Sequence, residues 1–134
     1  MAYTQEYRTL AGLRANSTGL ATSQFLFAKL ASTAGRVVAP GTVNSTTNPA
    51  IYLGVVMNQP SAFEEVEFAD SGIVKVIAAT STIAIGDRVY SNSTGKATDA
   101  GTTDNGFYAG RALTAAGAAN DIITVSLVAG GARY

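Results

Sequence analysis

Short β-prone runs separated by turn residues are the feature that most constrains the fold of this 134-residue chain. From residue 23 onward, runs rich in Val, Ile, Phe and Tyr alternate with clusters of Gly, Pro, Asn, Asp and Ser, which break strands. We expect strands at Phe25–Leu30, Arg36–Ala39, Tyr52–Met57, Phe63–Ala69, Ile73–Ala78, Asp87–Ser91, Phe107–Leu113 and Ile122–Val128. The pattern predicts an all-β fold: a small antiparallel β-barrel or sandwich over residues 23–129, with an extended N-terminal arm.

One turn predicts a register at the level of single residues. Asp70-Ser71-Gly72 suits a three-residue hairpin loop, with Gly72 in the left-handed conformation. The expected register pairs Phe68 with Val74, Val66 with Val76, and Glu67 with Lys75. The first two pairs would face the core, and the third would form an ion pair on the solvent face.

The stretch from Ile85 to Ala97 contains charged residues, hydroxyl groups and two glycines, so it could be a binding site or a turn. The glycines do not have phosphate-loop spacing, because Gly95-Lys96 is followed by Ala97 rather than by Ser or Thr. Asp87 can cap a turn through its carboxylate, and Val89 then follows as a core residue. We therefore interpret this stretch as turn, strand and turn.

Two acidic motifs have an alternative, chemical interpretation. Asp70-Ser71-Gly72 is also the active-site triplet of aspartic proteases, but Ile73-Val74 follows where those proteases carry a small residue and then Asp or Ser. Glu64-Glu65-Val66-Glu67 could ligate Ca²⁺ if further oxygen atoms converged on it, yet no calcium loop is present. A turn and a solvated strand face explain these two motifs, and we predict neither an enzyme nor a metal or cofactor site.

Residues 1–22 differ from the rest of the chain, because they are polar and carry four apolar points at Tyr3, Tyr7, Leu10 and Leu13. Those spacings suit one face of a short helix, although Gly12 and the cluster at residues 16–19 oppose a long one. The segment is either a disordered terminus or an arm that becomes ordered on a partner. No apolar leader is evident, so we do not expect a signal peptide.

Composition excludes several classes of function. The chain has nine basic and nine acidic residues, and their scatter leaves no basic stripe for binding nucleic acid. It has no Cys and no His, which removes disulfides, thiolate nucleophiles and the commonest general base. No apolar run reaches the roughly 18 residues of a membrane span.

The order of motifs resembles the capsid cement, or head decoration, proteins of tailed bacteriophages. The resemblance covers roughly residues 25–128 and leaves the N-terminal arm outside. The motifs that carry it mark turns and core positions, not catalytic or ligand-binding residues. They lie at Gly54–Val56, Gly72–Val76, Ile83–Val89, Gly95–Ala97, Gly110–Ala112 and Ile123–Leu127.

This resemblance implies a structural protein of the virion, assembled in the host cytoplasm, on the outer surface of the capsid. Its partners would be the major capsid protein and further copies of itself, in a homotrimer or a dimer. We expect the arm to contact a neighbouring subunit through Tyr3, Tyr7, Leu10 and Leu13, and the tail at residues 130–134 to add Arg133 and Tyr134 or to be frayed. The alternative function is a β-rich tail-fibre or carbohydrate-binding module, in which exposed Tyr would replace the Trp that the chain lacks.

Overall fold

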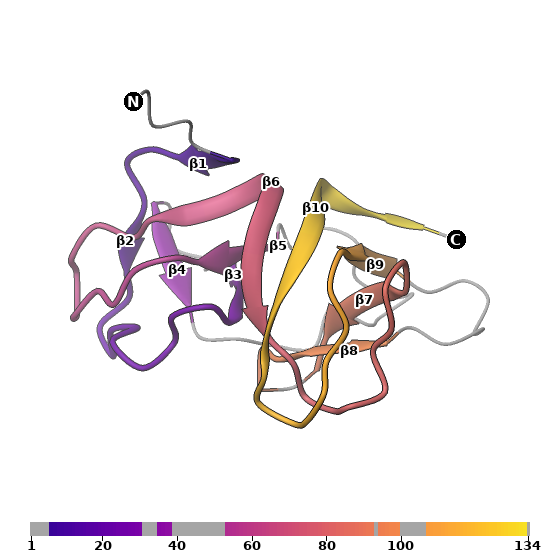
Figure 1. Ribbon diagram of the computed structural model, residues 1–134. Coiled ribbons are helices and arrows are strands. Elements are labelled where there is room, and N and C mark those ends of the chain that lie inside the picture. The colour runs from indigo at the N-terminus through magenta and orange to yellow at the C-terminus, as the bar shows by residue number, and fades with distance from the viewer. Residues whose placement is uncertain (1–5, 31–34, 39–52, 93, 100–106, 134) are drawn as a thin grey trace, which may run out of the picture.

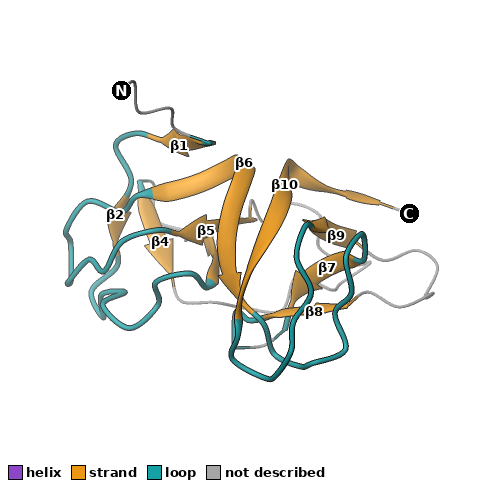
Figure 2. Ribbon diagram, in the orientation of Figure 1, coloured by secondary structure: helices purple, strands orange, loops and turns teal. Residues whose placement is uncertain are grey.

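A computed structural model describes residues 6–30, 35–38, 53–92, 94–99 and 107–133. The described chain contains strands and loops but no helix, so the all-β expectation is confirmed (Figures 1 and 2). The strands are β1 (Tyr7–Leu10), β2 (Arg14–Ala15), β3 (Phe27–Leu30), β4 (Arg36–Val38), β5 (Leu53–Val56), β6 (Phe68–Ile77), β7 (Arg88–Ser91), β8 (Ala97–Asp99), β9 (Phe107–Ala112) and β10 (Ile122–Arg133).

All ten strands belong to one sheet, which is not closed into a barrel. Its order is β2-β4-β3-β5-β6-β10-β9-β7-β8, and β1 pairs with β6 outside this path. The pairings are antiparallel except for β2 with β4, which run parallel. The sheet encloses two apolar clusters: a smaller one with Phe68, Leu20 and Val37, and a larger one with Val74, Val125 and other residues.

The predicted hairpin at Asp70-Ser71-Gly72 is wrong, because these residues lie inside the single long strand β6. Val74 pairs with Val125 of β10, not with Phe68. Gly72 does adopt the expected positive φ, 97°, but it allows the strand to bend rather than reverse. The N-terminal half of β6 pairs with β5 and β1 and the C-terminal half with β10, as the corner in Figure 1 shows.

The strand predicted over Phe63–Ala69 is also too long, because β6 begins at Phe68. The preceding residues form a loop, in which the N–H of Glu64 donates to the carbonyl of Ser61. Asn58 ties this loop down: its side chain donates to the carbonyl of Glu65 and accepts from the N–H of Glu67. Local side-chain hydrogen bonds of this kind compete with a sheet ladder.

The interpretation of Ile85–Ala97 as turn, strand and turn is confirmed. The carboxylate of Asp87 accepts the N–H of Ala84 at 2.8 Å, which caps the first turn. Val89 is fully buried, and β7 pairs with β8 across a turn that Asn92 holds by accepting the N–H groups of Thr94 and Lys96.

Candidate functional site

The N-terminal residues predicted as an arm lie, from Glu6 onward, against the sheet of their own chain. Tyr7 to Leu10 form strand β1, not a helical turn, and pair with Phe68–Gly72 at the bend of β6. A register shift between Arg8 and Thr9 adapts β1 to that bend. The expectation of a helical face is therefore wrong, because edge pairing with β6 satisfies the backbone of this segment instead.

An ion pair holds β1 on β6. The guanidinium of Arg8 donates to both carboxylate oxygens of Asp70, from Nε to Oδ1 at 2.9 Å and from Nη2 to Oδ2. Asp70 is 0 % exposed, whereas the side chain of Arg8 is 63 % exposed. Burial of a carboxylate is costly unless it is paired, so Arg8 makes the buried position of Asp70 tolerable. The Asp-Ser-Gly motif thus has a structural role here, in which the aspartate binds β1.

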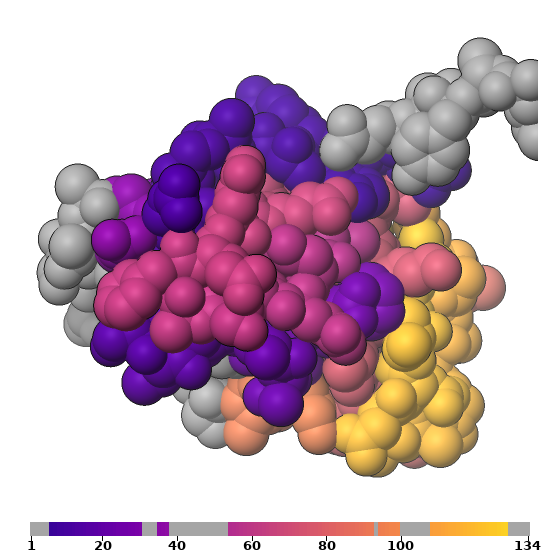
Figure 3. All heavy atoms as spheres, turned by 90° about the vertical axis from the view of Figure 1, so that its left-hand side faces the viewer, coloured from indigo at the N-terminus to yellow at the C-terminus, as the bar shows by residue number. Residues whose placement is uncertain are grey.

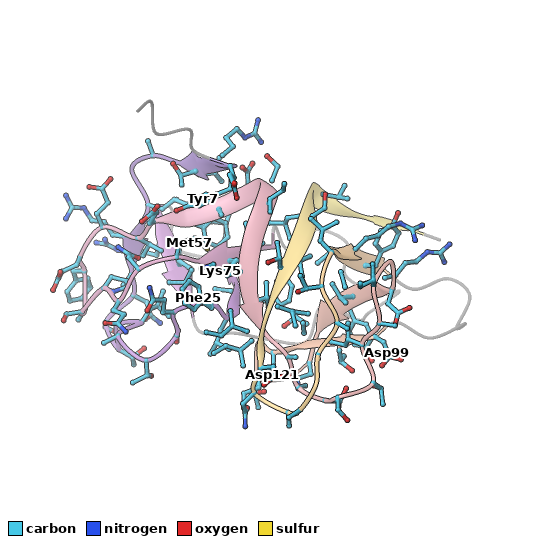
Figure 4. The ribbon with its side chains drawn as sticks, viewed as in Figure 1. Tyr7, Phe25, Met57, Lys75, Asp99 and Asp121 are labelled. Carbon is cyan, nitrogen blue, oxygen red and sulfur yellow. The ribbon has the colours of Figure 1, made fainter. Side chains whose placement is uncertain are left out.

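Tyr7 and Gly72 are paired across the two strands, and the backbones approach closely at this point. A Cβ on Gly72 would lie 2.7 Å from Cα of Tyr7 and 2.5 Å from the carbonyl oxygen of Glu6, closer than real side chains approach. The hydroxyl of Tyr7 donates to Oε1 of Glu67, and its ring packs against the larger cluster. Figure 4 shows Tyr7 and Met57 beside β6. Glycine is required at residue 72 both for its φ and for this approach.

Leu10 and Leu13 pack, partly buried, against the smaller apolar cluster. Sequence reasoning missed Ala15 and Leu20, which are almost completely buried in that cluster, and missed strand β2. Neither residue belongs to a regular apolar pattern, since Ala15 lies between Arg14 and Asn16 and Leu20 follows the turn residues at 16–19. Tyr3 and Tyr134 lie outside the described residues, and Arg133 ends β10 opposite Phe107 of β9.

A cavity of about 270 Å³ lies between the end of β1 and the loop before β6. It is lined by apolar, neutral polar and acidic residues: Thr9, Leu10, Ala11, Asn58, Glu65, Val66 and Glu67. Figure 3 looks at this end of the molecule, where the loop (pink) lies beside the N-terminal segment (indigo). The predicted anchor Leu10 therefore borders a recess that a partner side chain could enter.

A comparison with protein families matches most of the chain. The family described as phage cement protein matches residues 19–127. The chain belongs to this family. No curated protein matches it. The family is structural and associates with the phage capsid in the virion, and the earlier resemblance to capsid cement proteins is thereby confirmed. The match begins at Gly19, so β1, β2 and the predicted anchors precede it.

Two features of other classes of protein are absent from the described residues. No group of three or more His, Cys, Asp or Glu that could hold a metal ion occurs among them. Nor does this part of the chain contain a helix long and apolar enough to cross a membrane.

Proposed function

We propose that this cement protein binds the outer surface of the phage head over junctions between major capsid protein subunits and stabilises the expanded shell. The family match over residues 19–127 carries the proposal. The structure supports it, because one extensively paired sheet with two apolar clusters suits a rigid clamp. The chain is net neutral, so its contacts should depend on apolar and backbone groups and resist high salt.

Self-association is the second part of the proposal, as a homotrimer or else a dimer. A single contact with the shell can be weak, and joining several copies raises the effective concentration of each contact. The oligomer would therefore bind the shell more tightly than one chain does. Proteins of this kind are expected on the virion surface, where several capsid subunits lie close together.

The N-terminal segment, residues 1–22, is proposed to contact the capsid through Tyr3, Tyr7, Leu10 and Leu13, with Arg133 and Tyr134 of the tail as a second contact. Tyr7, Leu10 and Leu13 are only partly buried by their own chain, so each leaves surface for a partner. The cavity beside Leu10 supports the same position for the contact. The segment would thus pair with β6 of its own chain on one side and contact the capsid on the other.

Co-sedimentation tests the proposed function. Purified protein is mixed with expanded heads of its own phage that lack it, at low and high salt, and the pellet is quantified against protein concentration. Saturable pelleting that survives high salt is the expected result. Folded protein that stays in the supernatant while heads pellet would overturn it, and binding to a glycan array would then favour the tail-fibre or carbohydrate-binding alternative.

A further inference from the structure

Three exposed aliphatic side chains gather at one edge of the sheet, where β10 begins and β9 ends. Ile122 is 56 % exposed, Leu113 is 43 % exposed and Ile85 is 72 % exposed. Exposed apolar residues that are scattered singly are ordinary on protein surfaces, but a contiguous group of them marks a contact site. Backbone pairing decides whether these three form such a group.

Pairing within the sheet places two of them in one row. Ile122 pairs with the half-buried Ile77 of β6, and the N–H of Leu113 donates to the carbonyl of Thr124, two residues after Ile122. Residues two positions apart share one face of a strand, and Ile123 between them is buried in the larger cluster. Ile122 and Thr124 therefore point away from the core, and Leu113 lies beside them.

The turn before β7 extends the row. The N–H of Gly86 donates to the carbonyl of Ala112 at 2.7 Å, so Ile85 and Leu113 are each one residue away from this bond. Figure 1 shows the loop after β6 and the loop after β9 side by side below the strands. We call the resulting group the apolar ridge, which consists of Ile77, Ile85, Leu113 and Ile122.

Charged groups that border the ridge are engaged in their own turns or lie at its margin. The carboxylate of Asp87 accepts the N–H of Ala84, and the carboxylate of Asp121 accepts two N–H groups of the loop after β9. Lys75 pairs with Thr124 and is exposed, so its stem can cover apolar surface while its charge stays in water. The ridge is thus an uncharged surface with a polar rim, which is the composition of an interface core.

The area of the ridge favours a second copy of the chain as its partner. The exposed fractions of its side chains correspond to an apolar area on the order of 200 Å². A polar partner would add nothing to this value, whereas a second ridge doubles it to roughly 400 Å². A stable interface buries about 1,600 Å² in all, so two ridges would form its apolar centre, and the polar surface around them would form the rest.

We infer that the apolar ridge lies at the symmetry axis of the oligomer, so that Ile122 of one copy meets Ile122 of the next. This inference rests on the self-association part of the proposed function and supplies the surface that it uses. In a dimer the same patch serves both copies, and in a trimer three ridges surround the axis. Because apolar burial involves no charge, this contact persists at high salt, as the proposed function requires.

Cysteine cross-linking tests whether the ridge meets itself. The chain has no Cys, so Ile122→Cys places one thiol in each copy, and a mild thiol oxidant links two copies only where these thiols approach closely. Val128→Cys is the matched control, because Val128 is an exposed apolar residue of the same strand, about 20 Å further along. We expect Ile122→Cys to form the linked dimer on a non-reducing gel at least about tenfold faster than Val128→Cys.

Sedimentation equilibrium of the full-length protein without heads measures the strength of the contact. Ile122→Asn and Leu113→Asn should each weaken association about tenfold or more, since the apolar area is lost from every copy. Phe63→Asn removes an exposed apolar side chain outside the ridge and should leave the association constant within about twofold. Association of the wild type should be as strong or stronger at about 1 M salt than at about 0.15 M. Melting temperatures should stay within about 3 °C, because the substituted side chains are exposed.

The possible results distinguish the inference from the proposed function. A wild-type protein that stays monomeric up to about 100 μM overturns the inference, and so does an Ile122→Cys variant that cross-links no faster than Val128→Cys. If Ile122→Asn lowers pelleting with heads but not association of the free protein, the ridge faces the capsid and the inference is wrong. Monomers that still pellet with heads leave the proposed function standing. Copies that associate through the ridge but never pellet support the inference and refute the binding to heads.

Discussion

Replacing Arg8 with Ala should destabilise the fold far more than an exposed arginine normally would. Asp70 is fully buried, and Arg8 makes two hydrogen bonds to its carboxylate. Breaking a buried ion pair by removing one partner costs about 3–5 kcal/mol. Because Arg8 itself is 63 % exposed, water can reach part of the space that it vacates, and we expect a loss of about 2–3 kcal/mol.

Urea denaturation followed by circular dichroism measures this loss. Arg14→Ala is the matched control, because Arg14 is also exposed and donates only to a backbone carbonyl; it should cost less than about 1 kcal/mol. Adding Asp70→Asn to Arg8→Ala should recover part of the stability, since the buried charge is then removed as well.

A small effect would refute the reasoning. If Arg8→Ala lay within about 0.5 kcal/mol of the wild type, Asp70 would have to be solvated without Arg8, and β1 would not be bound to β6 by this pair. A double variant that is less stable than Arg8→Ala alone would show that Asp70 has other partners of greater weight than Arg8.

Four further changes test other parts of the structure. Gly72→Ala should lower the free energy of unfolding by about 2–4 kcal/mol in thermal or urea melts, because it adds strain at positive φ and a clash with β1. An unchanged free energy of unfolding would contradict the bend of β6 at Gly72 and its close approach to β1. Phe68→Ala should lower the free energy of unfolding by about 3–5 kcal/mol in the same melts, because packing in the smaller cluster is lost. A loss below about 1 kcal/mol would show that Phe68 does not pack in that cluster as described. Asp87→Ala should cost about 1 kcal/mol by removing the turn cap, and Asp121→Ala offers a comparison at another turn. Deletion of residues 2–19 should lower the melting temperature by roughly 10 °C or more, because it removes Arg8 and β2; an unchanged melt would show that the segment does not stabilise the sheet.

The sequence predicted the strands whose apolar pattern is local and missed those that depend on distant partners. The strands near Phe27, Val55, Val89 and Val125 were predicted because alternation and flanking turns define them. The long strand β6 was divided in two, since Gly72 permits a left-handed residue in a bend as readily as in a hairpin. Whether the chain bends or reverses at Gly72 depends on its pairing with β10 and β1, which are distant in sequence.

The predicted anchors of the N-terminal arm also show that contacts between distant residues cannot be predicted from local sequence. Tyr7, Leu10 and Leu13 were recognised as apolar points that need burial, but the sequence did not indicate that part of their burial comes from the same chain. The role of Arg8 is not visible in the sequence, because an ion pair between residues 62 positions apart leaves no local signal. Long-range pairs of this kind become visible only when the topology is known.

The position of β6 also has a consequence for how the chain acquires its structure. It pairs with β1 near the start of the sequence and with β10 near the end. During synthesis, β6 therefore waits for residues about 50 positions later before its second half has a partner, and contacts of such high sequence separation make folding slow. The same strand joins the two parts of the sheet, because β1 and β5 pair with its N-terminal half and β10 with its C-terminal half. A protein built this way should unfold slowly once complete, which favours a long lifetime over rapid turnover.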